Sequence, residues 1–315
     1  MSTAQSQSQS TWQWESATAG AIAGFATVAA VHPLDVVRTR FQVNDGRVSN
    51  LPTYKNTVHA ILTISRSEGL KGLYSGFSPA VLGSTVSWGL YFFFYSRAKE
   101  RYSRNRDEKL SPGLHLASAA EAGALVCLCT NPIWLVKTRL QLQSSLHQTR
   151  LYSGLYDALR TILREEGWSA LYRGIVPSLF LVSHGAVQFT AYEEFRKIVV
   201  EYKSRRRKES DKVANSDLLN SVDYAVLGGS SKVAAIMLTY PFQVIRARLQ
   251  QRPSKDGIPR YADSWHVMKE AARFEGFRGF YKGITPNLLK NAPAASLTFI
   301  VYENVLKLLK LIRKE

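Results

Sequence analysis

Three long stretches of the chain contain no charged residue. They cover residues 16–34, 72–96 and 174–192 and are 19, 25 and 19 residues long. A helix needs about 20 apolar residues to cross the hydrocarbon core of a bilayer, so each stretch is long enough to span a membrane. In the first stretch, Gly20 and Gly24 have the small-xxx-small spacing that lets a second helix approach closely. The pattern therefore predicts membrane-spanning helices.

Three further apolar stretches are each interrupted by one charged residue, which is Glu121, Lys232 or Lys290. The uncharged runs that remain are only 15, 13 and 12 residues long, so we expect these segments to fail a hydropathy criterion. Each nevertheless occupies a place in an internal repeat at which its sister segments are apolar. We therefore predict six spans, arranged as three helical hairpins with both chain termini on one face.

The repeat is marked by a ten-residue element that begins with proline. It occurs at residues 33–42, 132–141 and 241–250, and its prolines (Pro33, Pro132 and Pro241) lie 99 and 109 residues apart. A Glu-Gly pair follows each proline by 35, 34 and 34 residues, and a tyrosine precedes each of these glutamates by 14. Markers that stay in register over three copies indicate a triplicated unit of about 100 residues.

This unit divides the chain into three modules, at residues 14–100, 110–200 and 218–312. Residues 1–13 form a Ser/Gln-rich tail that we expect to be disordered, and residues 201–217 form a charged linker. A long polar connection joins the two spans of each module. Apolar residues at helical spacing within it predict a short surface helix. The predicted fold is an all-α membrane protein.

The chain is strongly basic, with 41 Lys and Arg against 24 Asp and Glu and a net charge of +17. Such a charge favours phosphates, carboxylates or an anionic membrane surface as partners. A soluble nucleic-acid-binding repeat protein is the competing class, but the long uncharged runs argue against it and predict no nucleic-acid partner. Cys127 and Cys129 lie in an apolar run and are interpreted as packing residues.

The sequence contains no Ser/His/Asp arrangement, no metal cluster and no phosphate-binding loop. We therefore predict a transporter with no catalytic residue, no metal and no cofactor. The amino terminus has neither a basic n-region nor a long apolar core, so we expect no secretory signal. It also lacks arginine, which argues against a cleaved mitochondrial presequence, although a short plastid address remains open.

The proline element combines a helix bend with charge. A proline inside a helix removes one backbone hydrogen bond and bends the axis. In each element a basic residue lies three positions after the third residue, which is where an acid can stand. The pairs are Asp35/Arg38, Trp134/Lys137 and Gln243/Arg246. Charges at the ends of converging helices can pair between helices and close a cavity, which would form a gate. The alternative is an ordinary basic cluster beside the membrane.

The pattern P-x-[DE]-x-x-[KR]-x-[KR], followed by E-G and aromatic-x-G and present three times, resembles the mitochondrial carrier family. The resemblance covers about residues 14–310. It implies a monomeric, pseudo-threefold barrel of six helices around a central substrate site that opens alternately to either side.

In the second element Trp134 stands in place of the acid. An element with tryptophan at this position resembles the branch of the family that carries folate, flavin and pyrimidine nucleotides. Residues 87–95, 120–124 and 183–186 resemble the folate and flavin members more narrowly. The resemblance is greatest to folate carriers of the chloroplast envelope, and it implies an anionic folate as substrate in the inner envelope membrane. The alternative is a carrier of FAD or pyrimidine nucleotides in the mitochondrial inner membrane.

The resemblance also implies a gate on each side. On the matrix or stromal side Asp35 pairs with Lys137, and Trp134 and Gln243 depart from the acidic pattern. Glutamines bridge this network at Gln42, Gln141 and Gln250. On the cytosolic side the expected gate residues are Lys99, Glu193, Arg196 and Glu303. Only the pair of Glu303 with Lys99 is complete, and a shift of one residue would replace Glu193 and Arg196 by Glu194 and Lys197.

For the substrate site, Lys290 lies seven residues past Gly283, at the family's contact position, and suits a carboxylate or phosphate. The alternative is a structural ion pair. Glu121 and Lys232 either pair with each other or bind substrate, with Glu121 accepting from the guanidine-like edge of a pterin. Trp88 either stacks on a flat ring of the substrate or packs against lipid or neighbouring helices. His184 and Gln188 are candidates for the pocket. The backbone amides at Gly76, Gly174 and Gly283 are expected to hold an acidic phospholipid.

Overall fold

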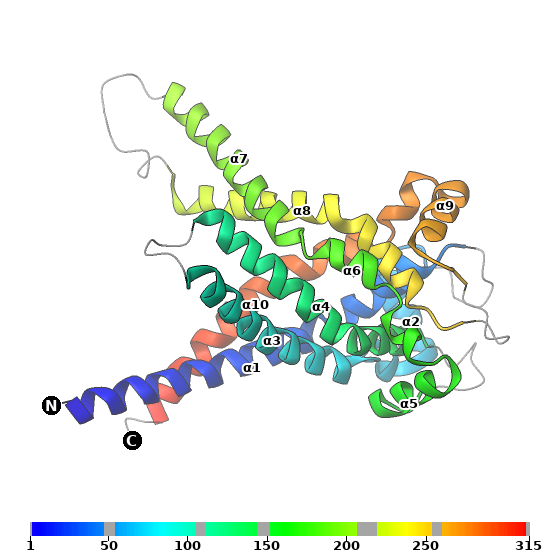
Figure 1. Ribbon diagram of the computed structural model, residues 1–315, viewed down its shortest axis with the longest axis horizontal. Coiled ribbons are helices and arrows are strands. Elements are labelled where there is room, and N and C mark those ends of the chain that lie inside the picture. The colour runs from blue at the N-terminus through cyan, green and yellow to red at the C-terminus, as the bar shows by residue number, and fades with distance from the viewer. Residues whose placement is uncertain are drawn as a thin grey trace. The chain divides into compact units, whose positions relative to one another are not determined.

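A computed structural model describes residues 2–46, 54–104, 111–143, 152–206, 219–253 and 260–312 (Figure 1). These residues form helices and turns and contain no strand. The α-helices are α1 (Ser2–Val43), α2 (Thr57–Leu73), α3 (Phe77–Ser103), α4 (Pro112–Leu142), α5 (Leu155–Glu165), α6 (Ile175–Leu181), α7 (His184–Arg206), α8 (Ser221–Leu249), α9 (Ser264–Glu275) and α10 (Ile284–Ile312). Two 3₁₀ helices, η1 (Trp168–Tyr172) and η3 (Phe277–Tyr281), precede α6 and α10.

The order of these helices follows the repeat. Each repeat has a long helix, a short helix and a second long helix, and in the second repeat the last of these is divided into α6 and α7. The long helices α1, α4 and α8 continue through Pro33, Pro132 and Pro241. The short helices α2, α5 and α9 lie in the polar connections, where the spacing of apolar residues predicted them.

The ends of two elements differ from the prediction. Helix α1 begins at Ser2, so it includes most of the tail that composition predicted to be disordered. Ala and Gln in this tail are good helix formers, and no Pro or Gly interrupts the helix before Gly20. Helix α7 continues to Arg206, so the first part of the predicted linker is helical, and the rest of the linker lies outside the described residues.

Three segments are long and apolar enough to cross a membrane: Thr18–Val43, Gly113–Leu142 and Trp168–Arg205. The second corrects the expectation that a segment containing Glu121 would fail a hydropathy criterion. Its other residues are mostly Ala, Leu, Val and Cys, which outweigh one carboxylate. The uncharged stretch 72–96 is not among the three, because Ser, Thr, Gly, Trp and Tyr lower its hydropathy although none is charged.

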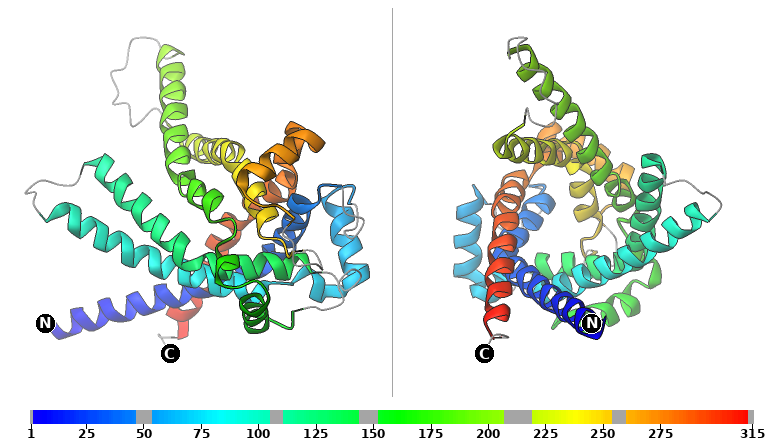
Figure 2. Two further views of the ribbon diagram at one scale, coloured as in Figure 1. Left: turned by 45° about the vertical axis from the view of Figure 1, so that its right-hand side comes forward. Right: turned by 90° about the vertical axis from the view of Figure 1, so that its left-hand side faces the viewer.

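The chain divides into two compact units. The first contains residues 1–85, 132–168 and 282–315. Within it α1 packs along α10 and contacts α2 (Figure 2). Its buried apolar cluster consists of Val37, Ala60, Ile64 and Leu73, so the carboxyl-terminal half of α1 is held against the short helix of its own repeat.

The second unit contains residues 86–131 and 169–281. Here α8 is the central element, because α6, α7, α9 and η3 all pack against it. The buried cluster of Ile245, Leu249, Tyr261 and Val267 joins α8 to α9. In both units, therefore, a long helix that contains the proline element is anchored by the short helix that follows it.

Candidate functional site

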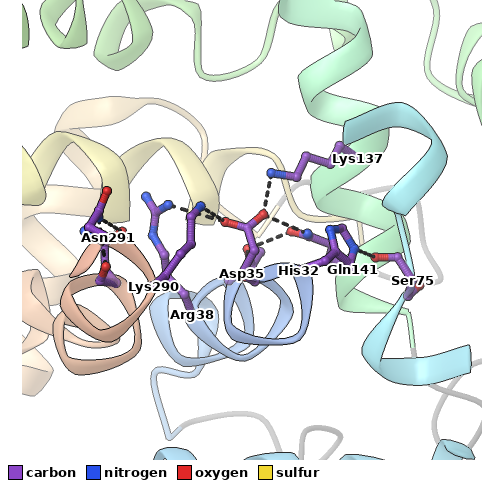
Figure 3. A network of polar contacts seen from close by, with 10 residues as sticks. His32, Asp35, Arg38, Ser75, Lys137, Gln141, Lys290 and Asn291 are labelled. Atoms are coloured by element: carbon purple, nitrogen blue, oxygen red, sulfur yellow. Dashed lines mark hydrogen bonds and ion pairs between the residues drawn. The ribbon is translucent and has the colours of Figure 1, made fainter. Parts of the chain in front are cut away.

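The carboxylate of Asp35 is the centre of a polar network in the first unit (Figure 3). Asp35 lies on α1 two residues after Pro33, and 7% of its side chain is exposed. Lys137 of α4 approaches one carboxylate oxygen and Lys290 of α10 the other, each with Nζ to O at 2.5 Å. One aspartate thus joins helices from all three repeats, and the predicted pair of Asp35 with Lys137 is present.

Two further side chains complete the contacts of Asp35. The Arg38 guanidinium lies 3.7 Å from Oδ1, one turn further along α1. Gln141 donates from Nε2 to Oδ2 at 3.1 Å and accepts from Thr39 Oγ1 at 2.7 Å. Gln141 therefore bridges α1 and α4, as the resemblance implied for its position. Gln42 and Gln250, which hold the same position in the other repeats, are also buried.

The network contains more positive than negative charge. Lys137 and Lys290 both pair with the carboxylate of Asp35, and Arg38 also lies near it. Moving a charge away from water is costly, and opposite charges and hydrogen bonds must offset that cost. Cations in excess of the available carboxylates make this place attractive to an added anion, such as a carboxylate or a phosphate.

Trp134 occupies the position at which the family pattern has an acid. Its ring lies under the ammonium group of Lys137, with Nζ 5.0 Å from the ring centroid. The negative face of an indole attracts a cation, although less strongly than a carboxylate does. Trp134 thus holds Lys137 from its own helix while Asp35 binds it from α1.

The carboxyl-terminal end of α4 is held by backbone contacts as well. The last carbonyls of a helix have no partner within the helix and need donors from elsewhere. Arg40 supplies two, donating from Nε to Gln141 O at 3.1 Å and from Nη2 to Gln143 O at 3.2 Å. Ser75 Oγ donates to the carbonyl of Leu140. At the end of α1, Lys282 donates to Asn44 O at 2.8 Å.

Glycines allow some of these close approaches. Gly76 has φ of +74°, and a Cβ there would lie 3.0 Å from Lys137 O and from Gln141 Cγ. Gly174 has φ of +80° and stands in the same relation to α8, where a Cβ would lie 3.4 Å from Arg246 O. Packing and a left-handed backbone thus account for these glycines, and lipid binding at their amides stays a prediction.

A buried ion pair recurs in all three repeats, and the sequence reasoning missed it. Each pair joins the second basic residue of the proline element to the glutamate of the Glu-Gly pair: Arg40–Glu68, Arg139–Glu166 and Arg248–Glu275. The arginine side chains are at most 1% exposed. The sequence signal was a nearly constant separation of 28, 27 and 27 residues between two markers that both recur. We call these three pairs the Arg–Glu clamps.

Of the two alternatives left open for Glu121 and Lys232, the described residues do not show a mutual ion pair. Glu121 contacts the guanidinium of Arg101 and accepts from Tyr102 Oη at 3.2 Å. Arg101 lies just beyond the uncharged stretch 72–96. The prediction compared only charged residues within the spans, so it left Arg101 out. Lys232 is half-buried in α8, and no carboxylate of the described residues pairs with it.

The remaining candidates for the pocket lie in the second unit. His184 shares a hydrogen bond of 2.9 Å with Thr239 Oγ1. Gln188 is half-buried on the same helix, α7. Trp88 is 62% exposed and stacks on Phe92, with ring centroids 5.8 Å apart. Its exposure leaves ring area free for another flat group.

Among the residues of the predicted cytosolic gate, the ion pair found for Glu303 lies within its own helix. Glu303 lies 4.0 Å from Lys307, one turn along α10, and both are exposed. On α7, Glu194 pairs with Lys197 at 2.7 Å, again as an exposed pair within one helix. Glu193 and Arg196 are half-buried. The pairing of Glu303 with Lys99 stays a prediction.

Comparison with known proteins places this site in a family. The family model described as "Mitochondrial carrier protein" matches residues 9–106, 108–203 and 217–312. "Folate transporter 1, chloroplastic" of Arabidopsis thaliana is 77% identical over 95% of this chain and 96% of its own length. "Nicotinamide adenine dinucleotide transporter 1, chloroplastic" of the same plant is 40% identical over 92% and 90%. The "Mitochondrial FAD carrier protein FLX1" of Saccharomyces cerevisiae is 30% identical over 91% and 94%.

The three matched segments agree with the three repeats marked by the proline elements and the Arg–Glu clamps. Together they cover almost the whole chain. The predicted family is confirmed: the chain belongs to the mitochondrial carrier family, whose members are membrane transporters and not enzymes.

Proposed function

We propose that this chain transports folate across the inner membrane of the chloroplast envelope by alternating access. One observation carries the proposal: the 77% identity, over 95% of the chain, to a chloroplastic folate transporter. The nicotinamide adenine dinucleotide and FAD carriers are far less similar, at 40% and 30% identity. The basic network around Asp35 suits a substrate that carries carboxylates.

The transporting body is a monomeric barrel of six spans. Its spans are α1, α3, α4, the pair α6 and α7, α8 and α10, two for each repeat. Contacts that pass from one repeat to the next support a closed order of repeats. Gly76 packs on the end of α4, Gly174 on the end of α8, and Lys282 binds the end of α1. Each repeat thus meets the one that follows it, and the third meets the first.

The stromal gate consists of the contacts that hold the ends of α1 and α4 together. Asp35 with Lys137 supplies its ionic part, and Arg40 and Ser75 supply hydrogen bonds to backbone carbonyls. A largely buried ion pair contributes little net free energy, because the cost of desolvation offsets much of its attraction, and a neutral hydrogen bond contributes about 0.5 to 1.5 kcal/mol. Such a gate is closed by several small terms, so a modest binding energy is enough to open it.

Lys290 couples the substrate to this gate. In the closed state its ammonium group is bound to Asp35 at 2.5 Å, and 24% of its side chain is exposed. A carboxylate on the glutamate part of folate can take the place of Asp35 as the partner of Lys290. The exchange keeps the lysine paired and removes one of the contacts of Asp35. Substrate binding thus weakens the gate without leaving an unpaired cation in the membrane.

Other residues complete the proposed site. Lys232 is a cation within a span that no described carboxylate pairs with, so it is the second candidate for a substrate carboxylate. Trp88, His184 and Gln188 are the candidates for contact with the pterin ring. Glu121 forms an ion pair with Arg101, so it can bind substrate only when that ion pair is broken.

On the cytosolic side we propose the gate of Glu303 with Lys99, together with Glu193 and Arg196. The half-burial of Glu193 and Arg196, against the exposure of Glu194 and Lys197, supports this register of α7. Acidic phospholipids at Gly76, Gly174 and Gly283 remain part of the proposal.

The test is uptake by purified protein in liposomes. Labelled folate, FAD and nicotinamide adenine dinucleotide are compared at equal concentrations, and protein-free liposomes give the background. We expect folate uptake well above that of both nucleotides. Preferred uptake of a nucleotide would contradict the proposal. A second series without internal substrate tests whether a gate whose ionic contacts depend on one carboxylate lets the empty carrier reorient. In that case uptake proceeds without exchange.

A further inference from the structure

The prolines inside α1 and α8 each leave one backbone carbonyl without its usual donor. In an α-helix a backbone amide donates to the carbonyl four residues earlier, and proline has no amide hydrogen. Pro33 lies within α1 and Pro241 within α8, so the carbonyls of Ala29 and Met237 lose their partner in the helix. An unsatisfied carbonyl is costly in a membrane span, where little water can replace the donor.

A tyrosine of the same repeat supplies each missing donor. Tyr74 Oη donates to Ala29 O at 3.2 Å, and Tyr281 Oη donates to Met237 O at 3.2 Å. In each case the tyrosine begins the aromatic-x-G motif of its repeat, and the carbonyl stands four residues before the proline. Corresponding atoms therefore meet in the first and third repeats, which indicates a common role.

The rings of these tyrosines are held by the residue that precedes each proline. His32 stacks on Tyr74 with ring centroids 5.9 Å apart, and Tyr240 stacks on Tyr281 with centroids 6.2 Å apart. His32 and Tyr240 are buried, at 1% and 0% exposure. A tyrosine side chain has only two rotatable bonds before its ring, so a fixed ring also fixes the direction of the hydroxyl group.

The residue after each tyrosine binds the next repeat. Ser75 accepts at its carbonyl from His32 Nε2 at 3.0 Å, because a carbonyl can only accept (Figure 3). Its hydroxyl donates to Leu140 O near the end of α4. In the third repeat the corresponding residue is Lys282, which donates to Asn44 O at the end of α1. The connection that reaches the proline of one repeat thus also holds the long helix of the next.

We propose that Tyr74 and Tyr281 are positioning residues of the carrier. Each phenol replaces the amide that proline lacks, and so fixes a long helix at its proline to the connection that binds the next repeat. Pro33 lies two residues before Asp35, so Tyr74 sets the position from which this carboxylate reaches its two lysines. The consequence for transport rests on the proposed function, whereas the hydrogen bonds do not.

A double-mutant cycle with the proline tests whether one donor replaces the other. In Pro33→Ala the amide of residue 33 can donate to Ala29 O, so this carbonyl no longer needs Tyr74. We expect Tyr74→Phe to lower the midpoint of thermal unfolding in detergent by several degrees, and by much less in the Pro33→Ala background. Phenylalanine keeps the ring, so an equal shift in both backgrounds, or none in either, would overturn the proposal.

The third repeat provides an independent cycle of the same design. Tyr281→Phe is measured with and without Pro241→Ala, and we expect the same dependence on the proline. This cycle decides alone if Pro33→Ala does not fold. A shift that is equal in the presence and absence of Pro241 would contradict the replacement of the amide by the phenol.

Tyr172 of the second repeat is the matched control. It is 43% exposed, against 41% for Tyr74, but its hydroxyl has no hydrogen-bond partner among the described residues. Asn131, which precedes the proline of this repeat, instead donates from Nδ2 to Leu171 O at 2.7 Å. Tyr172→Phe should therefore leave the unfolding midpoint unchanged. A fall as large as that of Tyr74→Phe would show that this tyrosine stabilises the fold by another route, and would overturn the proposal.

Transport provides a readout that a role in folding alone would not change. The Tyr74 hydroxyl binds backbone and not substrate, so Tyr74→Phe should lower the maximal rate of folate uptake per folded protein with little change in KM. Loss of one hydrogen bond to a carbonyl that stays unsatisfied corresponds to a reduction of about fivefold or more. A raised KM with an unchanged rate would place this hydroxyl in the substrate site instead. The unfolding cycles contain no folate, so their result is independent of the identity of the substrate.

Discussion

The Arg–Glu clamps have the same residues in all three repeats, whereas the gate residues differ from one repeat to the next. Every repeat keeps its clamp, and every clamp is buried. At the acid position of the proline element, by contrast, the repeats have Asp35, Trp134 and Gln243. The clamps attach each long helix to its short helix, a task that is the same in all three repeats. The gate faces a substrate that has no threefold symmetry, so its residues have diverged.

The divergence also concentrates charge. Asp35 is the one acid among the three acid positions, and it binds two lysines that come from the other two repeats. A symmetric gate would distribute three ion pairs around the axis, and each would need separate opening. In this protein a single carboxylate carries the ionic part, so one competing anion is enough to disturb it.

Breaking a clamp should give the largest effect on stability. In Arg248→Ala, the buried carboxylate of Glu275 loses its contacts of 2.6 and 3.0 Å with the guanidinium group. Removal of one member of a buried pair costs roughly 3 to 5 kcal/mol. Thermal unfolding in detergent should show a large fall in the midpoint. The variant Arg248→Met/Glu275→Leu should recover most of it, whereas a small shift in Arg248→Ala would contradict the role of the clamp.

Replacement of Lys290 should give the largest effect on transport with little effect on stability. We expect Lys290→Ala to abolish folate uptake, because the substrate loses its partner and Asp35 keeps Lys137. The midpoint of thermal unfolding should change by only a few degrees, because Lys290 is partly exposed and supplies only one of the ion pairs of Asp35. Lys307→Ala, on the same helix and exposed, is the control and should transport normally. Unchanged uptake by Lys290→Ala would remove this residue from the site.

The sequence predicted one half of this network and missed the other. The pair of Asp35 with Lys137 followed from the family pattern, in which both residues have fixed positions after a proline. The contact of Asp35 with Lys290 spans 255 positions and depends on how α10 packs along α1, which no repeat spacing specifies. The sequence did identify Lys290 as important, because a lysine within a span is costly unless it has a role.

The errors have a common physical cause. One of the two alternatives gave Glu121 a partner within the spans, but Arg101 reaches it from the end of α3. Long basic side chains extend several ångströms along a helix, so residues outside an apolar stretch can serve residues inside it. The residues of the Arg–Glu clamps recur in the sequence, but recurrence alone did not indicate which of the recurring residues are in contact.

Removal of the gate carboxylate should change transport in a way that distinguishes gate from site. In Asp35→Asn, Lys137 and Lys290 lose their shared anion, so the stromal side is less firmly closed while Lys290 is free to bind substrate. We expect a lower maximal rate with an unchanged or lower KM for folate. Asp35→Glu should retain part of the rate. A raised KM with an unchanged rate would instead place Asp35 among the substrate contacts.

Trp134 offers the smallest and most specific change, because it acts on Lys137 through its ring alone. A cation over an aromatic face contributes about 0.5 to 1 kcal/mol at a partly exposed site, so Trp134→Leu should alter the uptake rate by about two- to fivefold. Trp134→Phe keeps a ring face and should lie between Trp134→Leu and the original protein. Trp134→Asp restores the family's acid one turn from Lys137, where it competes with Asp35 for the ammonium group. It should therefore weaken the contact between α1 and α4, and uptake rates for the four proteins, measured at saturating folate, give the order. If leucine and phenylalanine behaved alike, the ring at this position would serve packing, and the asymmetry of the gate would rest on Asp35 alone.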